Sequence, residues 1–313
     1  MIINCAASVD FNEQITSAIN INYNGCMRML DLAHGCRRLQ IFTHVSTCYV
    51  NCEKKGFIKE QIYDIKEDSQ EVIAKVSKLT VKEQEENLKS ILGPWPNTYT
   101  FTKSMAERTL RRLRNPSLPT LLLRPAIIGG AMKEPYQGWT DTISAAGGLS
   151  LVGGIGLVNW IHGDHNNIAD LIPVDICSNM IIAGTALQAN KPELKVAHCA
   201  SSHLKPMTWG EFRDYTFRYI KHHPYEMQLF KPSVKFIENE TLFKTAFYFK
   251  NQLPVDILDK VSKIPGVGSS SFHNTVKKGK LMVSRAWETG LLFDHFTTNS
   301  WIYESKVIDE FLR

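Results

Sequence analysis

A tyrosine and a lysine four positions apart are the residues of this sequence whose spacing most plainly indicates chemistry. Tyr99 and Lys103 lie in the stretch NTYTFTKSMAER, residues 97–108. On a helix, side chains four positions apart share a face, with Cβ atoms roughly 5–6 Å apart. A lysine ammonium at that position favours the phenolate and so lowers the pKa of the tyrosine. This spacing is what a tyrosine needs to act as a general acid toward a carbonyl.

Two hydroxyl residues earlier in the chain strengthen this interpretation, because the YxxxK pattern alone is weak. The run LQIFTHVST, residues 39–47, is apolar and β-branched, which predicts a strand that ends at Ser46 and Thr47. Ligands of open α/β sheets bind at the carboxyl ends of the strands. We therefore expect one of these hydroxyls to hold the substrate oxygen that the tyrosine protonates.

Alternating strand and helix patterns surround both groups. Residues 1–8 predict a short buried strand, residues 12–36 a helix, and residues 39–47 a second strand. The helix that carries the tyrosine and lysine follows. The continuous apolar run TLLLRPAII, residues 120–128, then predicts a third strand that is buried on both faces. This order of elements is typical of a parallel sheet with right-handed crossovers.

Two regions depart from the alternation. Residues 53–92 are rich in Lys, Glu and Asp with helical apolar spacing, and predict a mostly solvated helical insertion. After about residue 202 the pattern predicts amphipathic helices, one of them over residues 300–312. The glycine-rich run at 145–158 predicts a loop or a close-packed turn.

The expected fold is α/β: a partial doubly wound (Rossmann-like) parallel sheet that lacks its first strands, followed by a mainly helical C-terminal region. We place an incomplete Rossmann-like domain over residues 1–202 and a helical domain over residues 203–313.

Composition excludes several classes of protein. The 313 residues are 43% hydrophobic, and the formal net charge of +5 is spread along the chain and mixed with acids, which does not predict nucleic-acid binding. Seven cysteines without a CxxC pair indicate a reducing, intracellular compartment and not a disulfide scaffold. No run of about 18 apolar residues predicts a transmembrane helix. The HxxH at 162–165 has no clear third ligand, so we predict no metal site.

Seven stretches of the sequence together resemble one known family. They are NCAASVDFNE, AININYNGCMRMLDLA, HVSTCYVNC, NTYTFTKSMAE, LPTLLLRPAIIGG, EPYQGW and ADLIPVDICSNMIIAG. On these stretches the chain resembles an extended short-chain dehydrogenase/reductase, and within that group a fatty acyl-CoA reductase with a male-sterility-type NAD-binding domain. The later TWGEF, LPVDILD and WIYES resemble the C-terminal domain of that family more loosely.

The resemblance implies a role for each matching residue. Tyr99 would donate a proton to the carbonyl, and Lys103 would bind the nicotinamide ribose and tune Tyr99. Thr47, with Ser46 as the alternative, would hydrogen-bond the substrate oxygen. Asn22 would support the helix and a proton-relay water. The residues implied to bind the cofactor are Ala6, Ala7, Tyr99, Lys103, Pro125, Ala126, Ile127 and Ile128.

The reaction implied is the NADPH-dependent reduction of a long-chain acyl-CoA, through an aldehyde, to a primary alcohol. The helical C-terminal region, with its aromatic side chains, would be the lid of an apolar channel; plain core packing of those aromatics is the alternative. The family also implies a membrane surface, of the peroxisome or the endoplasmic reticulum, with a mitochondrial complex as the alternative location.

The phosphate-binding part of a dinucleotide site is missing from the sequence. In this family a strand and a Gly-rich turn of the GxxGxxG kind are expected ahead of the strand at residues 1–8. Without them that strand is an open edge of the sheet, a place where another chain can pair. Three explanations stay open: a second chain pairs along Met1–Ala7, the sequence is part of a longer chain, or the chain is a structural subunit of a larger assembly.

Three functions therefore compete. The first is a fatty acyl-CoA reductase, complete or completed by another chain. The second is another extended reductase, such as a sugar-nucleotide or sterol enzyme, which EPYQGW argues against. The third is a reductase-like subunit of an assembly with impaired catalysis.

Overall fold

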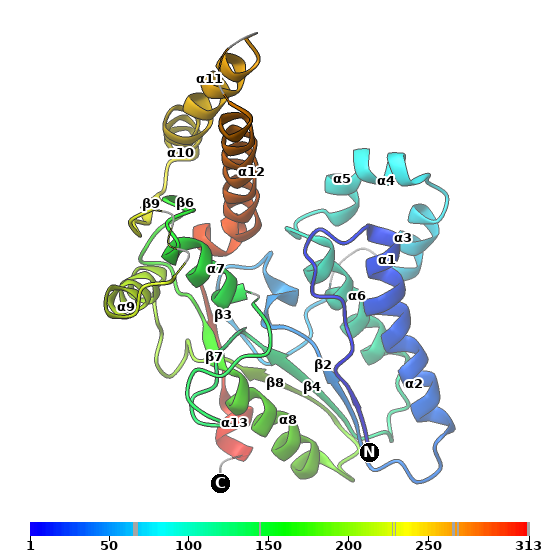
Figure 1. Ribbon diagram of the computed structural model, residues 1–313. Coiled ribbons are helices and arrows are strands. Elements are labelled where there is room, and N and C mark those ends of the chain that lie inside the picture. Colours follow the sequence, from blue (N-terminus) through cyan, green and yellow to red (C-terminus); the bar gives the residue numbers. More distant parts are fainter. Residues whose placement is uncertain are drawn as a thin grey trace. The chain divides into compact units, whose positions relative to one another are not determined.

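The computed structural model describes residues 1–64, 68–143, 145–226, 228, 230–264, 267 and 269–311. Its central feature is a four-stranded parallel sheet in the order β1-β2-β4-β8 (Figure 1). The strands are β1 (Ile2–Asn4), β2 (Phe42–Val45), β4 (Thr120–Pro125) and β8 (Leu194–Cys199). The three predicted strands are thus present, and β8 is a fourth strand that the sequence pattern did not reveal.

Helices cover both faces of this sheet. On one face lie α1 (Ile15–Ala18), the π-helical η1 (Ile19–Asn24), α2 (Gly25–Gly35) and α6 (Thr98–Leu113), and on the other lies α8 (Val174–Gln188). Neighbouring residues of β2 reach opposite helices, as the pleat requires. The Thr43 hydroxyl is 2.9 Å from that of Thr185 in α8, whereas His44 Nδ1 is 3.6 Å from Cys26 Sγ in α2. The predicted doubly wound α/β class is confirmed.

Strand β4 explains why its sequence is apolar without alternation. Every residue of β4 is buried, and Leu121, Leu122 and Leu123 are each 0% exposed. Leu121 and Leu123 join a hydrophobic cluster with Ile41, Ala197, Val307 and side chains of α8. Because helices cover both faces of the sheet, its central strand must be apolar throughout.

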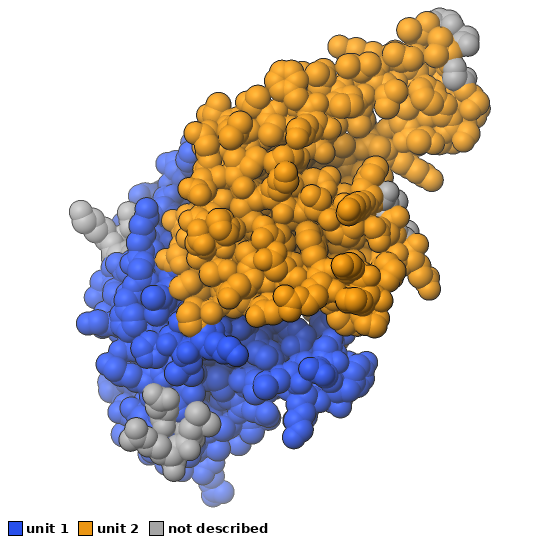
Figure 2. All heavy atoms as spheres, turned by 90° about the vertical axis from the view of Figure 1, so that its left-hand side faces the viewer, with its two compact units in different colours: residues 1–140, 170–205, 301–313 blue, residues 141–169, 206–300 orange. Residues whose placement is uncertain are grey.

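The chain forms two compact units, coloured blue and orange in Figure 2. Unit 1 comprises residues 1–140, 170–205 and 301–313, and unit 2 comprises residues 141–169 and 206–300. This division differs from the predicted boundary at residue 202. A helical unit is inserted into the α/β unit at two places, and the chain returns to the α/β unit at its end.

The return of the chain to unit 1 has a clear physical cause. Strand β10 (Trp301–Tyr303) pairs in parallel with β3 (Gly56–Ile58), and the Trp301 indole donates to the Lys54 carbonyl at 2.7 Å. The helix predicted over 300–312 is therefore wrong in its first part: a strand precedes the short helix α13 (Lys306–Phe311), and residue 312 lies outside the described residues.

The charged insertion after β3 is helical, as predicted. It contains α3 (Ser69–Val76), α4 (Val81–Glu86) and α5 (Leu88–Leu92), while residues 65–67 lie outside the described part of the chain. Two of its acids reach the end of α6. Arg111 forms an ion pair with Asp64, and Arg112 forms one with Asp68. Arg111 and Arg112 of α6 therefore contact acids of the insertion.

Unit 2 is mainly helical. It contains α7 (Ala145–Gly154), α9 (Trp209–His222), α10 (Glu240–Phe247), η3 (Tyr248–Gln252), α11 (Leu253–Ser262), α12 (Ser270–Thr298) and the parallel pair β6 (Trp160–His162) and β9 (Lys235–Ile237). The loop predicted at 145–158 is wrong, because most of this run is helix α7. Its glycines allow close packing: a Cβ on Gly154 would lie 2.5 Å from the side chains of Ile220 and Tyr225.

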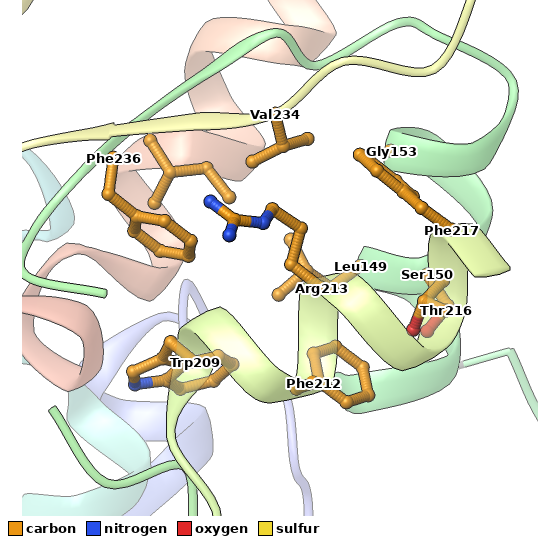
Figure 3. A pocket seen from close by; sticks show the side chains of 11 residues that line it. Leu149, Ser150, Gly153, Trp209, Phe212, Arg213, Thr216, Phe217, Val234 and Phe236 are labelled. Atoms are coloured by element: carbon orange, nitrogen blue, oxygen red, sulfur yellow. The ribbon is translucent and has the colours of Figure 1, made fainter. Parts of the chain in front are cut away.

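Some of the aromatic side chains of α9 pack inside unit 2, whereas Tyr215 and Tyr219 are exposed. Trp209 and Phe212 line a hollow of about 20 Å³ together with Phe236 and the Arg213 side chain (Figure 3). Trp209 is 1% exposed, and its indole donates to the Phe296 carbonyl at 3.0 Å. A hollow of this size holds about one water molecule, so this part of α9 serves core packing. None of the described helices has the length and apolar character needed to cross a bilayer.

Candidate active site

Helix α6 carries Tyr99 and Lys103 one turn apart, as the sequence predicted. The helix begins after Asn97, whose side chain accepts a hydrogen bond from the Thr100 backbone N–H at 2.9 Å. Such a cap satisfies one of the free N–H groups at a helix start. Lys103 is 2% exposed, and Tyr99 is half-buried with its ring stacked on Phe11. The first two turns of α6 thus hold both side chains in place.

The carboxyl end of β2 lies against the same helix. The Ser46 backbone N–H donates to the Leu123 carbonyl at 2.7 Å, and the Thr47 hydroxyl donates to the Pro125 carbonyl at 3.4 Å. The Thr47 side chain also shares a hydrogen bond with Tyr99. The structure therefore brings Thr47, Tyr99 and Pro125 together. The buried Ser46 hydroxyl has no partner among the described residues.

The lysine points at the same strand end. Lys103 Nζ donates to the Val45 carbonyl at 2.9 Å. Burial lowers the pKa of Lys103 to about 8, because it disfavours the charged amine. At neutral pH the group is still mainly an ammonium. The amine is bonded to the last residue of β2, directly before the loop that holds Ser46 and Thr47.

The expected lowering of the tyrosine pKa is not found. Burial raises the pKa of Tyr99 to about 12, and the hydrogen bond with Thr47 offsets only part of this shift. The phenol thus keeps its proton throughout the neutral range. The spacing in the sequence could place the lysine beside the tyrosine, but it could not show how strongly burial disfavours the phenolate.

Asn22 links the loop after β1 to helix α6. It lies in the π-helical η1 and is 2% exposed. Its Nδ2 donates to the Ser8 carbonyl at 3.1 Å and to the Thr102 hydroxyl at 3.1 Å, and its Oδ1 accepts from the Ser8 N–H at 2.9 Å. All of these bonds serve to position the backbone and the helix. Single π-helical turns of this kind are frequent at functional sites.

The residues predicted to line the cofactor lie just beyond two strand ends. Ala6 and Ala7 follow β1, and Pro125, Ala126, Ile127 and Ile128 end β4 and enter β5 (Ile127–Gly129). The carboxyl ends of parallel strands meet at one edge of a sheet, and β2 separates β1 from β4 there. Small side chains and the Lys103 amine at this edge fit the nicotinamide and ribose end of a dinucleotide. The described residues include no Gly-rich strand-to-helix turn for its phosphates.

The sequence did not reveal that two carboxylates bind the backbone of the loops at the carboxyl edge of the sheet. Asp170 is 2% exposed and accepts from the N–H groups of Ser201 and Ser202 at 2.7 and 3.0 Å. Its carbonyl accepts from the Ile127 N–H at 3.0 Å. Asp175, in the IPVD stretch, accepts from the N–H groups of residues 132–134, and these bonds hold its pKa at about 2. The available signal was the pair of aspartates that flank the short apolar strand β7 (Leu171–Pro173).

Comparisons with known proteins assign the chain to a family. Residues 1–181 match the family model described as male sterility protein. Fatty acyl-CoA reductase 1 of Xenopus laevis is 29% identical over 98% of this chain and 58% of that protein. Probable fatty acyl-CoA reductase 5 of Arabidopsis thaliana is 30% identical over 84% of this chain and 59% of that protein. The chain therefore spans less than two thirds of the length of these relatives.

Two solved structures share the fold at low identity. The terminal R domain of the myxalamid PKS-NRPS pathway is 17% identical, with a TM-score of 0.55, over 99% of this chain and 61% of its own. MoeE5 in complex with UDP-glucose and NAD is 14% identical, with a TM-score of 0.50, over 75% of this chain and 64% of its own. At these identities the likeness concerns the fold alone.

Proposed function

This chain belongs to the male sterility protein family and is similar to fatty acyl-CoA reductases. From that premise we propose that it is an oxidoreductase that serves the NADPH-dependent reduction of long-chain acyl-CoA to fatty alcohol. The single observation that carries the proposal is the meeting of the Thr47 hydroxyl, the protonated Tyr99 and the buried Lys103 at the carboxyl end of β2. The substrate class comes from the names of the curated relatives, and NADPH from the family resemblance.

Each of these side chains has a chemical task in the proposed reaction. A bound nicotinamide would supply the hydride for the carbonyl carbon, with one NADPH consumed in the reduction of the thioester and another in that of the aldehyde. Thr47 and Tyr99 donate hydrogen bonds to the carbonyl oxygen and fix its position. In the reduction of the aldehyde, Tyr99 passes its phenolic proton to the oxygen as that atom becomes an alkoxide, and so completes the alcohol. Lys103 holds the ribose hydroxyls and stabilises the tyrosinate that is left.

The raised pKa of Tyr99 suits a proton donor in this reaction. A phenol with a pKa of about 12 is almost wholly protonated at neutral pH, so the acid form is present when the hydride arrives. In the first reduction, of the thioester, the same hydrogen bonds stabilise the oxyanion, and the thiolate of coenzyme A leaves. Hydrogen-bond donors aimed at a developing oxyanion commonly supply a large part of the rate.

A direct test is an assay of NADPH oxidation with long-chain acyl-CoA. The chain is purified with an affinity tag, together with any chain that copurifies, and compared with Tyr99→Phe. We expect turnover that NADH supports less well and that the substitution largely removes. Full turnover by Tyr99→Phe would contradict the assignment of Tyr99 as the proton donor. An absence of turnover in every preparation would contradict the proposal that the chain is a reductase.

A second candidate function rests on the edge of the sheet. Strand β1 has β2 as its one neighbour among the described strands, and Ile3 on β1 is 38% exposed. An apolar edge strand favours pairing with a further strand. The chain would then be one part of a split reductase or a reductase-like subunit of an assembly. Copurification followed by mass spectrometry tests this candidate, which predicts a stable partner, whereas recovery of a lone, active chain would contradict it. Association with a membrane surface likewise stays a prediction.

A further inference from the structure

A buried ion pair lies one helical turn beyond Lys103 on α6. Glu107 follows Lys103 by four positions on α6, and Lys103 follows Tyr99 by four. Side chains at this spacing lie along one face of a helix. Lys103 and Glu107 are 2% and 1% exposed, so both charged groups are inside the protein. A buried carboxylate one turn from a buried amine needs a physical explanation, since charges are rarely buried without a partner.

The partner of Glu107 is Arg124 on β4. Arg124 is 0% exposed and grips the carboxylate with two hydrogen bonds, from Nε to Oε1 at 2.9 Å and from Nη2 to Oε2 at 2.6 Å. Its Nη1 donates to the Gln61 carbonyl at 3.0 Å and lies 3.2 Å from His198 Nε2. A two-pronged contact of this kind fixes the orientation of a carboxylate. Arg124 also directly precedes Pro125, where the predicted cofactor stretch begins.

The other titratable groups that face Lys103 are neutral near pH 7. They are Cys5 after β1, Cys26 on α2 and His44 on β2. Burial raises the pKa of Cys5, and it raises that of Cys26 to about 12, so both stay thiols. Burial and the Lys103 charge hold the pKa of His44 well below its usual range, so His44 carries no charge. Among the described residues facing Lys103, the acidic charge therefore comes from Glu107.

We infer that the Glu107–Arg124 pair is a positioning unit for Lys103: the carboxylate keeps the buried lysine as an ammonium, and the arginine keeps the carboxylate in place. The same pair joins the helix that carries Tyr99 to the strand that leads into the predicted cofactor stretch. This inference deepens the proposed function, and its catalytic consequence rests on that function. The electrostatic part stands without it, because the charge of Lys103 exists whether or not substrate is reduced.

The test follows the proton on Lys103 directly. The protein is labelled with ¹³Cε-lysine, the Lys103 signal is assigned by its loss in Lys103→Arg, and the titration is recorded by NMR. In Glu107→Gln we expect the midpoint for Lys103 to move to lower pH, because the opposing charge is gone. The matched control is Asp64→Asn, which removes an exposed carboxylate from another ion pair of α6 and should leave the midpoint unchanged.

A second variant guards against misfolding. Glu107→Gln leaves Arg124 buried without its partner, whereas the double variant Glu107→Gln, Arg124→Met removes both charges, an exchange that proteins often tolerate. Both variants should lower the Lys103 midpoint. Arg124→Lys keeps the positive charge but loses the paired hydrogen bonds to Glu107. It should lower the Lys103 midpoint less than Glu107→Gln does. An unchanged midpoint in a folded double variant would overturn the inference.

The catalytic consequence is measured separately, so that the two proposals can fail independently. In Glu107→Gln we expect kcat/KM with NADPH and acyl-CoA to fall about fivefold at pH 8, since a shift of one pKa unit from about 8 lowers the charged fraction of Lys103 from about one half to about one tenth. The alkaline limb of the pH profile should move to lower pH. If the wild type shows no turnover while the NMR midpoint moves, the reductase proposal fails and the positioning inference holds.

Discussion

At the scale of single residues, the candidate site depends on which groups hold a proton. Burial raises the pKa of Tyr99 to about 12, away from the neutral range, and lowers that of Lys103 to about 8, toward it, because in each case it disfavours the charged form. At neutral pH the Tyr99 phenol is protonated and can donate its proton. The Lys103 amine is mainly charged and loses its charge as the pH rises through about 8. Such opposed shifts are a mark of acid–base sites.

Replacement of Tyr99 by Phe removes the phenolic proton while keeping the ring that stacks on Phe11. We expect kcat to fall roughly 10²–10⁴-fold, the usual contribution of a general acid, with little change in cofactor affinity. Steady-state kinetics and fluorescence titration with NADPH measure the two effects. The matched control is Tyr219→Phe in unit 2, which loses a hydroxyl from a residue that is 66% exposed and should keep full rate.

The pH dependence of turnover should reflect Lys103. A base with a pKa of about 8 is charged below that pH and neutral above it, so kcat/KM should fall as the pH rises through about 8. Because kcat/KM reports the groups of the free enzyme, the profile is recorded at low substrate concentration. Tyr99 stays protonated over this range and contributes no limb of its own. A flat profile from pH 7 to 10 would remove Lys103 from the mechanism.

The helical spacing of Tyr99 and Lys103 was predictable because it is a local property of the sequence. The positions of Ser46 and Thr47 followed from a rule about parallel strands. The Val45 carbonyl that binds Lys103, and the Arg124 side chain that grips Glu107, were not predictable, because each contact joins residues from separate elements. Only the packed fold brings such groups together.

At the scale of elements, the Asn22 side chain bridges the loop after β1 and helix α6. Asn22→Ala removes the bonds that Asn22 makes to Ser8 and Thr102 and leaves the half-buried Ser8 N–H without that partner. We expect the free energy of unfolding to fall by about 1–3 kcal/mol, and the NADPH affinity to fall with the loosening of Ala6 and Ala7. Chemical denaturation and ligand titration test both effects. Asn12→Ala, in the same loop, is the control, and equal losses in the two variants would contradict a special role of Asn22.

Elements with long periodic or continuous apolar patterns were predicted well, and short ones were not. The central strand β4 and the helix α6 follow directly from their residues. Helix α7 was taken for a loop because its glycines are poor helix formers, yet Gly154 is needed where Ile220 and Tyr225 pack closely. Strand β10 has three residues, too few to show a period of two, and it is fixed by its pairing with β3.

At the scale of the whole molecule, the chain is an α/β unit interrupted by a helical one. The chain returns to unit 1 at strand β10, where Trp301 is 3% exposed and its indole donates to the Lys54 carbonyl. No sequence pattern predicts this return, because it pairs residues more than two hundred positions apart. The compact units divide the chain at other positions than the predicted boundary at residue 202.

Trp301→Ala should therefore destabilise unit 1. Loss of a buried tryptophan usually lowers the free energy of unfolding by about 3–5 kcal/mol, and β3 would lose its partner strand. Hydrogen exchange should accelerate in residues 56–58 and 301–303. Trp139→Ala, at a half-buried tryptophan of unit 1 outside this strand pair, is the comparison; exchange in β3 that stays slow in Trp301→Ala would contradict the account.

The central claim is that Tyr99, Lys103 and Thr47 are the acid–base half of a nicotinamide-dependent acyl-CoA reductase. The most direct measurement is NADPH oxidation with long-chain acyl-CoA by the purified chain and its copurifying partners, with the product identified by mass spectrometry, for wild type and Tyr99→Phe side by side. The account predicts fatty alcohol from the wild type and a loss of roughly 10²-fold or more in the variant. Equal rates for the two proteins would contradict it.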